Sequence, residues 1–120
     1  MTPIDPRVAW AVEQMSGCLH QSIRIPELAR AVNLSPSRFT LLFRAETGVS
    51  PARYLQQLRM NEARTLIQST FLSIKEIMAK VGFNDPSHFT RSFARHHGVP
   101  PSRLRSARSS AELVEVPIAS

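Results

Sequence analysis

The chain has 120 residues, 42% of them hydrophobic, which suits one globular domain or two very small modules that share a core. It carries 15 Lys and Arg residues against 9 Asp and Glu residues, and no apolar run approaches the roughly 18 residues that a membrane span needs. The single cysteine, Cys18, excludes an intrachain disulfide. Together with an N-terminus that lacks the pattern of a secretory signal, it predicts a cytoplasmic protein.

The predicted elements are all helices. A Ser or Asp side chain can cap the first amides of a helix, and Pro is favoured at the first helical position. Ser73 and Glu76 predict a capping box, and Gly48 and Gly98 are expected to end helices. With the apolar spacing, these signals predict helices over about residues 6–19, 26–32, 36–46, 51–68, 74–81 and 86–96, and a short helix from Pro101. The predicted cap residues are Asp5, Ser35, Ser50, Ser73 and Asp85.

The sequence contains an internal repeat of about 50 residues. Two copies are too few for a solenoid, and they favour two equivalent modules that each bind one repeat of a partner such as double-stranded DNA. The extra residue of the second copy lies in its turn. The first copy runs Pro36-Ser37-Arg38-Phe39-Thr40-Leu41-Leu42-Phe43, and the second runs Pro86-Ser87-His88-Phe89-Thr90-Arg91-Ser92-Phe93.

Each copy predicts a short helix, a tight turn and a second helix, which is the helix-turn-helix arrangement that places its second helix in the major groove of DNA. Phe39 and Phe43, like Phe89 and Phe93, have the spacing of a buried helix face, so the opposite face of each second helix should point outward. The candidate base-contacting residues on these outward faces are Ser37, Arg38, Thr40, Leu41, Arg44, Ser87, His88, Thr90, Arg91 and Arg95.

Four further residues are predicted to contact phosphate. Arg53 and Arg103 occupy equivalent positions just after each second helix. Ser35 and Ser73 cap helices whose first amides can bind an anion. For Arg59, on the longest predicted helix, an ion pair with Glu62 or Glu76 is favoured over a DNA contact.

No residues indicate catalysis, a cofactor or a metal. Cys18-x-His20 and His96-His97 do not supply the three or four converging ligands of a zinc site. The sequence has no Gly-rich phosphate loop, and neither a Ser-His-Asp arrangement nor a carboxylate pair is brought together by the helix register. We therefore expect a protein that is not an enzyme and has no cofactor.

Two runs resemble the AraC/XylS family of bacterial transcription regulators, and the likeness covers about residues 7–106. It implies a DNA-binding domain of seven helices, in which two helix-turn-helix subdomains are joined by a long linker helix. The helices near residues 36–46 and 86–96 would enter successive major grooves, and members often contact RNA polymerase. The runs are Leu28-Ala29-x-x-Val32-x-Leu34-Ser35-x-x-x-Phe39-x-x-x-Phe43-x-x-x-Thr47-Gly48 and Ile74-x-x-Ile77-x-x-x-Val81-Gly82-Phe83-x-Asp85-x-Ser87-x-Phe89-x-x-x-Phe93, followed by Gly98-Val99-Pro100-Pro101.

The chain departs from this family at Leu41, where Arg is frequent. Leu41 could meet a thymine methyl group, whereas Arg91 in the second module keeps the side chain that bonds guanine. The second module is therefore expected to supply more of the base-specific hydrogen bonds. Met78 replaces a small Ala, which affects packing.

The sequence predicts a double helix-turn-helix domain over residues 1–108, with modules at about 6–49 and 72–106, a linker helix at 51–68 and a flexible tail at 109–120. We expect it to bind promoter DNA as a monomer, with no membrane contact. A linker helix of about 18 residues spans about 27 Å, less than the ~34 Å between successive grooves. If this helix holds the modules rigidly, bound DNA should bend towards the protein. Two alternatives are a helical protein-interaction module and the DNA-binding fragment of a larger ligand-sensing regulator.

Overall fold

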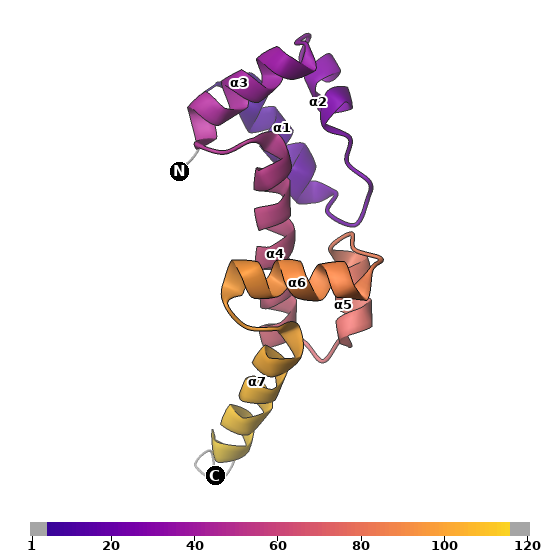
Figure 1. The fold of residues 1–120 in the computed structure, drawn as a ribbon, viewed down its shortest axis with the longest axis vertical. Helices are drawn as coiled ribbons and strands as arrows, with labels where there is room; N and C mark the ends of the chain where they lie inside the picture. Colours follow the sequence, from indigo (N-terminus) through magenta and orange to yellow (C-terminus); the bar gives the residue numbers. More distant parts are fainter. Residues whose placement is uncertain (1–4, 116–120) are drawn as a thin grey trace. The chain divides into compact units, whose positions relative to one another are not determined.

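The structure, a computed structural model, describes residues 5–115 and the side chains of residues 5–108. The described part of the chain is helical and contains no strand, which confirms the predicted all-α class (Figure 1). Each of the first six helices begins and ends within two residues of its predicted bounds. The helices are α1 (Pro6–Gly17), α2 (Ile25–Ala31), α3 (Pro36–Thr47), α4 (Pro51–Ser69), α5 (Ile74–Lys80), α6 (Pro86–His97) and α7 (Pro101–Glu115).

The predicted caps fix where the helices begin. A side-chain oxygen of each cap residue accepts a hydrogen bond from a backbone N–H in the first turn of the following helix, and at Ser73 the Glu76 carboxylate completes a capping box. Gly48 and Gly98 end α3 and α6 in the left-handed conformation, with φ of 86° and 84°. The residues that supply the caps are Asp5, Ser35, Ser50, Ser73 and Asp85.

The turns of the two helix-turn-helix modules have the same backbone geometry. Asn33 in the first turn and Gly82 in the second adopt positive φ, at 61° and 86°. The next residues, Leu34 and Phe83, each donate a backbone N–H to the carbonyl oxygen five residues earlier, at 3.0 and 2.8 Å. The second turn accommodates the extra Asn84 after this shared motif. The duplication seen in the sequence is therefore also a duplication of local structure.

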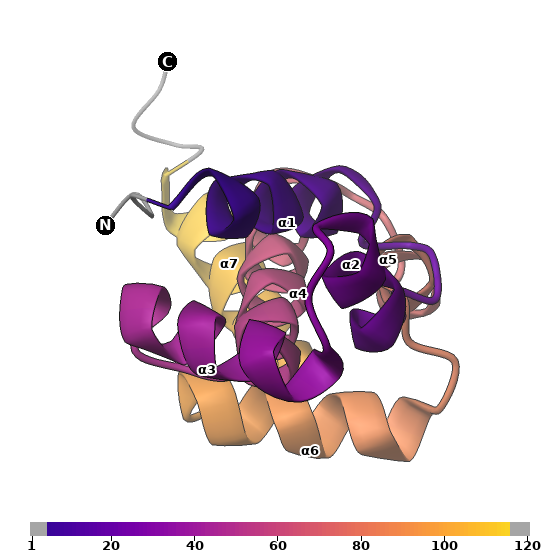
Figure 2. The same ribbon diagram turned by 90° about the horizontal axis from the view of Figure 1, so that it is seen from above.

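The chain divides into two compact units, and the division falls inside α4, between Arg59 and Met60. In the first unit, α1, α2, α3 and the N-terminal half of α4 enclose an apolar core. Phe43 of α3 meets the ring of Tyr54 of α4 edge-on, with 5.3 Å between ring centroids. α3 lies across α4 rather than along it (Figures 1 and 2). The core residues of this unit are Val8, Ala11, Met15, Leu28, Ala29, Phe39, Phe43 and Leu55.

The second unit has a core of its own, formed by the C-terminal half of α4 with α5 and α6, and Leu104 of α7 packs against it. The rings of Phe83, Phe89 and Phe93 follow one another with centroid separations of 5.4 and 5.9 Å. α6 also lies across α4 (Figures 1 and 2). The core residues of this unit are Met60, Ala63, Ile67, Ile77, Met78, Val81, Phe83, Phe89 and Phe93.

The last helix is longer than the sequence predicted. α7 continues to Glu115, so the expected tail at 109–120 overlaps it over residues 109–115. Ala111, Glu112 and Leu113 are strong helix formers, and their propensity extends the helix where the apolar pattern thins. Residues 116–120 lie outside the described part of the chain, so a tail there stays a prediction.

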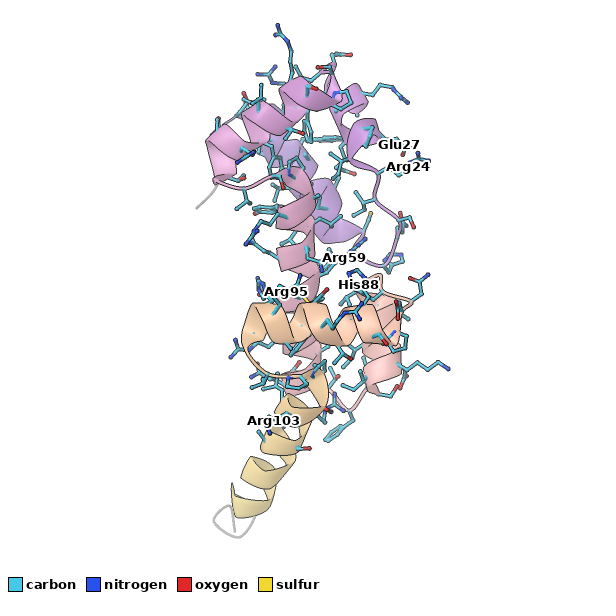
Figure 3. The ribbon with its side chains drawn as sticks, viewed as in Figure 1. Arg24, Glu27, Arg59, His88, Arg95 and Arg103 are labelled. Carbon is cyan, nitrogen blue, oxygen red and sulfur yellow. The ribbon has the colours of Figure 1, made fainter. Side chains whose placement is uncertain are left out.

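The environment of Arg59 corrects a second prediction. Its Nη2 donates a hydrogen bond to the backbone carbonyl of Gln21 at 3.0 Å, in place of the predicted ion pair with Glu62 or Glu76. Partial burial lowers the pKa of the Arg59 guanidinium below its usual value. Its Nε is buried and has no hydrogen-bond partner among the described residues. Arg59 therefore fastens the loop between α1 and α2 to α4 within the first unit (Figure 3).

No helix among the described residues is both long enough and apolar enough to cross a membrane.

Candidate nucleic-acid interface

The outward face of α3 is set by its buried face. Phe39 and Phe43 are fully buried, and the α-helical period places the exposed residues of α3 on the opposite side of the helix. Four of the five predicted base-contacting side chains are exposed, and the fifth, Thr40, is half-buried. Leu41 is 70% exposed, which makes it a large apolar side chain on an otherwise polar or basic surface. The exposed four are Ser37, Arg38, Leu41 and Arg44.

The outward face of α6 has the same construction. Phe89 and Phe93 are fully buried, and all five predicted base-contacting side chains are exposed. Figure 3 shows His88 and Arg95 on α6. The five exposed residues are Ser87, His88, Thr90, Arg91 and Arg95.

An open hollow of about 390 Å³ lies on this face of α6. Ser87, Thr90 and Arg91 line it together with Pro86, for which the sequence predicted a helix start but no contact with DNA. Pro86 is exposed at the first position of the helix. The position of Pro86 directly after a cap residue predicts only that it starts a helix. Whether it also lines the outward face depends on how α6 packs against its unit.

His88 differs from the other outward residues of α6 because its ring packs against Phe83, with 5.2 Å between centroids. Phe83 belongs to the turn between α5 and α6 and is itself buried. This contact orients the imidazole and leaves it exposed. The sequence placed His88 on the outward face correctly but contained no signal for the ring contact.

Arg53 and Arg103 are exposed at the third position of α4 and α7, so the structure gives them matching places in the two modules. Arg103 lies on the first turn of α7 (Figure 3). Each module therefore has an exposed cation in the first turn of the helix that follows α3 or α6.

The two predicted serine contacts differ in their partners. The Oγ of Ser35 accepts the backbone N–H of Arg38 at 3.2 Å, which leaves its hydroxyl hydrogen available to an anion. At Ser73, the backbone N–H donates to Oε1 of Glu76 and the Oγ accepts the N–H of Glu76, both at 3.0 Å. Hydrogen bonding of the Glu76 carboxylate to the Ser73 backbone N–H, and then to the Ser73 hydroxyl, holds the pKa of Glu76 below its usual value. A phosphate at Ser73 would therefore compete with a carboxylate already in place.

The electrostatic balance favours an anionic partner. Residues 1–108 contain fifteen Lys and Arg against seven Asp and Glu, a net charge of +8. Neither outward face includes a carboxylate among its predicted residues. Asp85, at the start of α6, is occupied as a cap by the backbone N–H of Ser87 at 3.0 Å.

The histidines that resembled a metal site have structural partners instead. Nε2 of His97 lies 2.9 Å from the carbonyl oxygen of Met60, and Nε2 of His96 lies 3.1 Å from Oδ1 of Asn61. They connect the end of α6 to α4 within the second unit. Between residues 5 and 108, no group of three or more His, Cys, Asp or Glu side chains is placed to hold a metal ion.

Comparisons with known proteins agree with this architecture. A family model described as a helix-turn-helix domain matches residues 28–107. The arabinose operon regulatory protein of Escherichia coli is 35% identical over 105 residues, which are 87% of this chain and 36% of that protein. The chain thus spans little more than a third of the length of this relative.

Two solved structures have the same fold. One is a transcriptional regulator from Chromobacterium violaceum described as an AraC-type DNA-binding-domain protein, with 30% identity and a TM-score of 0.78 over 86% of this chain and 92% of that one. The other is the DNA-binding domain of the global transcriptional factor AdpA in complex with a target DNA, with 26% identity and a TM-score of 0.83 over 89% and 96%. The chain belongs to the AraC family of helix-turn-helix transcription regulators and consists largely of its double helix-turn-helix domain.

Proposed function

We propose that this chain binds double-stranded promoter DNA in a sequence-specific manner, as the DNA-binding part of a bacterial transcription regulator. The observation that supports this most directly is the pair of outward faces on α3 and α6. Each is held outward by two buried Phe side chains and presents short polar and basic residues. The similar domain of AdpA was solved with its target DNA.

In this proposal, electrostatic attraction supplies affinity and the two faces supply specificity. The basic domain docks on the phosphate backbone and releases counterions. α3 and α6 then enter two successive major grooves, where small side chains allow close approach and Arg side chains donate to base edges. The base contacts are assigned to Ser37, Arg38, Thr40, Leu41, Arg44, Ser87, His88, Thr90, Arg91 and Arg95.

Phosphate contacts are assigned to Arg53, Arg103 and Ser35, and to Ser73 as the weakest of the four. The first two are exposed cations at equivalent helix starts, and Ser35 caps the helix that enters the groove. Ser73 must share its amide with Glu76, so we expect it to add least to the affinity.

One chain contains both modules, so the proposal requires only a monomer on each site. It also places the protein in the cytoplasm, with RNA polymerase as a further partner at the promoter. Because the chain covers 36% of the arabinose regulator, a ligand-sensing segment elsewhere in the whole protein is consistent with the proposal.

Electrophoretic mobility shift with duplexes enriched from a random pool tests this function. We expect a 1:1 complex on the enriched duplex and much weaker binding to the same duplex with its sequence scrambled. Equal affinity for the two duplexes would contradict sequence-specific binding. Failure to shift either duplex would favour the alternative of a protein-interaction module.

A further inference from the structure

The internal repeat allows the two outward faces to be compared residue by residue. Positions 50 residues apart are equivalent because α3 and α6, the recognition helices, each begin with a Pro directly after the cap residue. At the third helical position Arg38 corresponds to His88, and at the sixth Leu41 corresponds to Arg91. The first module thus has Arg at the third position and Leu at the sixth, whereas the second module has His at the third position and Arg at the sixth.

We propose, as a refinement of the proposed DNA binding, that the two half-sites are chemically different. Leu41 contacts the C5-methyl group of a thymine in the half-site of α3, whereas Arg91 bonds O6 and N7 of a guanine at the equivalent position in the half-site of α6.

The assignment of Leu41 follows from its exposure and its neighbours. It is 70% exposed on the same face as Arg38, one turn further along α3, and it does not belong to the buried core of its unit. Its side chain has no hydrogen-bonding group, and the thymine methyl is the apolar feature of the major-groove edge of the base pairs. A Leu that enters the groove at this position therefore favours thymine.

The assignment of Arg91 follows from the hollow on α6. Arg91 lines that hollow with Ser87 and Thr90, whose short side chains leave room for a base edge to approach. The guanidinium can donate to both guanine acceptors at once. Position six of α6 therefore favours guanine where position six of α3 favours thymine.

Arg38 would place the guanine contact of the first half-site at a different position from the guanine contact of the second half-site. It lies three residues before the position equivalent to Arg91, which is about 4.5 Å along the helix axis. A guanine contacted by Arg38 would therefore lie at a different position of its half-site from the guanine contacted by Arg91. His88, oriented by Phe83, occupies the matching position in the second module.

Replacement of thymine by deoxyuridine tests the first assignment, because it removes only the methyl group. The thymine opposite Leu41 is located by selecting duplexes from a random pool and footprinting the complex. For the unmodified protein, deoxyuridine at this thymine should weaken binding about fourfold, the value of one buried methylene-sized group. Leu41→Ala should weaken binding to the thymine duplex, and the variant should bind the thymine and deoxyuridine duplexes with equal affinity.

Two controls make the result specific to this contact. Deoxyuridine at thymines of the second half-site should change the affinity of Leu41→Ala and of the unmodified protein by the same factor. 7-Deazaguanine opposite Arg91, which lacks the N7 acceptor, should weaken the unmodified protein roughly tenfold and Arg91→Ala hardly at all.

The possible outcomes separate this inference from the function on which it rests. If the selection returns no preferred sequence, DNA recognition itself fails. If it returns a site that the chain binds tightly, but with guanine opposite Leu41 or with no loss on deoxyuridine, the proposed asymmetry is wrong while sequence-specific binding stands.

Discussion

The guanidinium of Arg108 on α7 donates a hydrogen bond from Nη1 to the carbonyl oxygen of Ile67 at 2.9 Å, and so joins α7 to the last turn of α4. The same Nη1 donates to the carbonyl of Thr70, and the guanidinium lies over the exposed ring of Phe71, 4.7 Å from its centroid. The last carbonyls of a helix lack intrahelical donors and form the negative end of its dipole. Arg108 therefore acts as a cap supplied by a distant segment.

We predict that Arg108→Ala destabilises the second unit by about 1–3 kcal/mol, because it removes the charged donor of two part-buried hydrogen bonds to carbonyl oxygens. Chemical denaturation followed by circular dichroism measures the change. Arg103→Ala, on the exposed side of the same helix, is the matched control and should be close to neutral. Equal effects of the two substitutions would show that Arg108 is not a cap.

The capping box of α5 predicts a pH dependence of stability. The Ser73 N–H and hydroxyl stabilise the ionised Glu76 carboxylate and hold its pKa below the usual 4.5 in the folded protein. A depressed folded pKa contributes stability above the unfolded value, and that stability is lost as pH falls below 4.5 through the lowered pKa. Glu76→Gln lacks this titration, so its melting temperature should approach that of the unmodified protein as pH falls through this window. A constant difference between the two proteins at all pH values would contradict the assignment.

The two recognition helices are predicted to differ in their share of the binding free energy. Arg91→Ala removes a two-point hydrogen bond and should weaken binding by about 1–3 kcal/mol, whereas Leu41→Ala removes only apolar contact and should cost less. Fluorescence anisotropy on a selected duplex gives both values. A larger loss from Leu41→Ala would mean that the second module does not dominate hydrogen bonding to bases.

The phosphate contacts predict a salt dependence. If Arg53, Arg103 and other basic side chains together neutralise about six phosphates, the logarithm of the binding constant should fall against the logarithm of salt concentration with a slope near −5. Arg53→Ala and Arg103→Ala should each reduce the slope by about 1 and weaken binding to all sequences alike. Arg64→Ala, an exposed Arg with no assigned contact, is the control and should keep the slope. A flat salt dependence of the unmodified protein would favour a protein partner.

The length of α4 predicts bending of the bound duplex. Its 19 residues span about 28 Å, which is less than the ~34 Å between successive major grooves. Contact of both recognition helices at once should then bend the DNA towards the protein, at a cost of a few kcal/mol. Circular-permutation gel shift measures the bend, and a duplex with one half-site scrambled should stay straight. A straight duplex in the full complex would contradict a stiff linker.

The elements of this fold were predictable because their signals are local. Cap residues, Pro at the first helical position and the spacing of buried Phe side chains act within one or two turns, and they placed Phe39, Phe43, Phe89 and Phe93 in the core correctly. The outward faces followed from the same period. The end of α7 was not predicted, because the thinning apolar pattern outweighed the helix propensity of its last residues.

The contacts that join distant segments could not be predicted in this way. Charge alone suggested a carboxylate partner for Arg59, whereas a backbone carbonyl 38 residues away in sequence accepts its hydrogen bond. The position of Gln21 depends on how the loop after α1 packs, which no local pattern specifies. The contacts of Arg108 with α4, and of His88 with Phe83, depend in the same way on tertiary packing.

Selection of bound duplexes from a fully randomised pool tests most directly whether both modules contact bases. The proposed function predicts two blocks of preferred sequence whose centres lie about 10 base pairs apart, one helical turn of DNA, with different bases in each block. Arg91→Ala should relax the preference at the guanine position of one block and leave the other block intact. A single preferred block, or two blocks at unrelated spacings, would contradict binding by α3 and α6 in successive grooves.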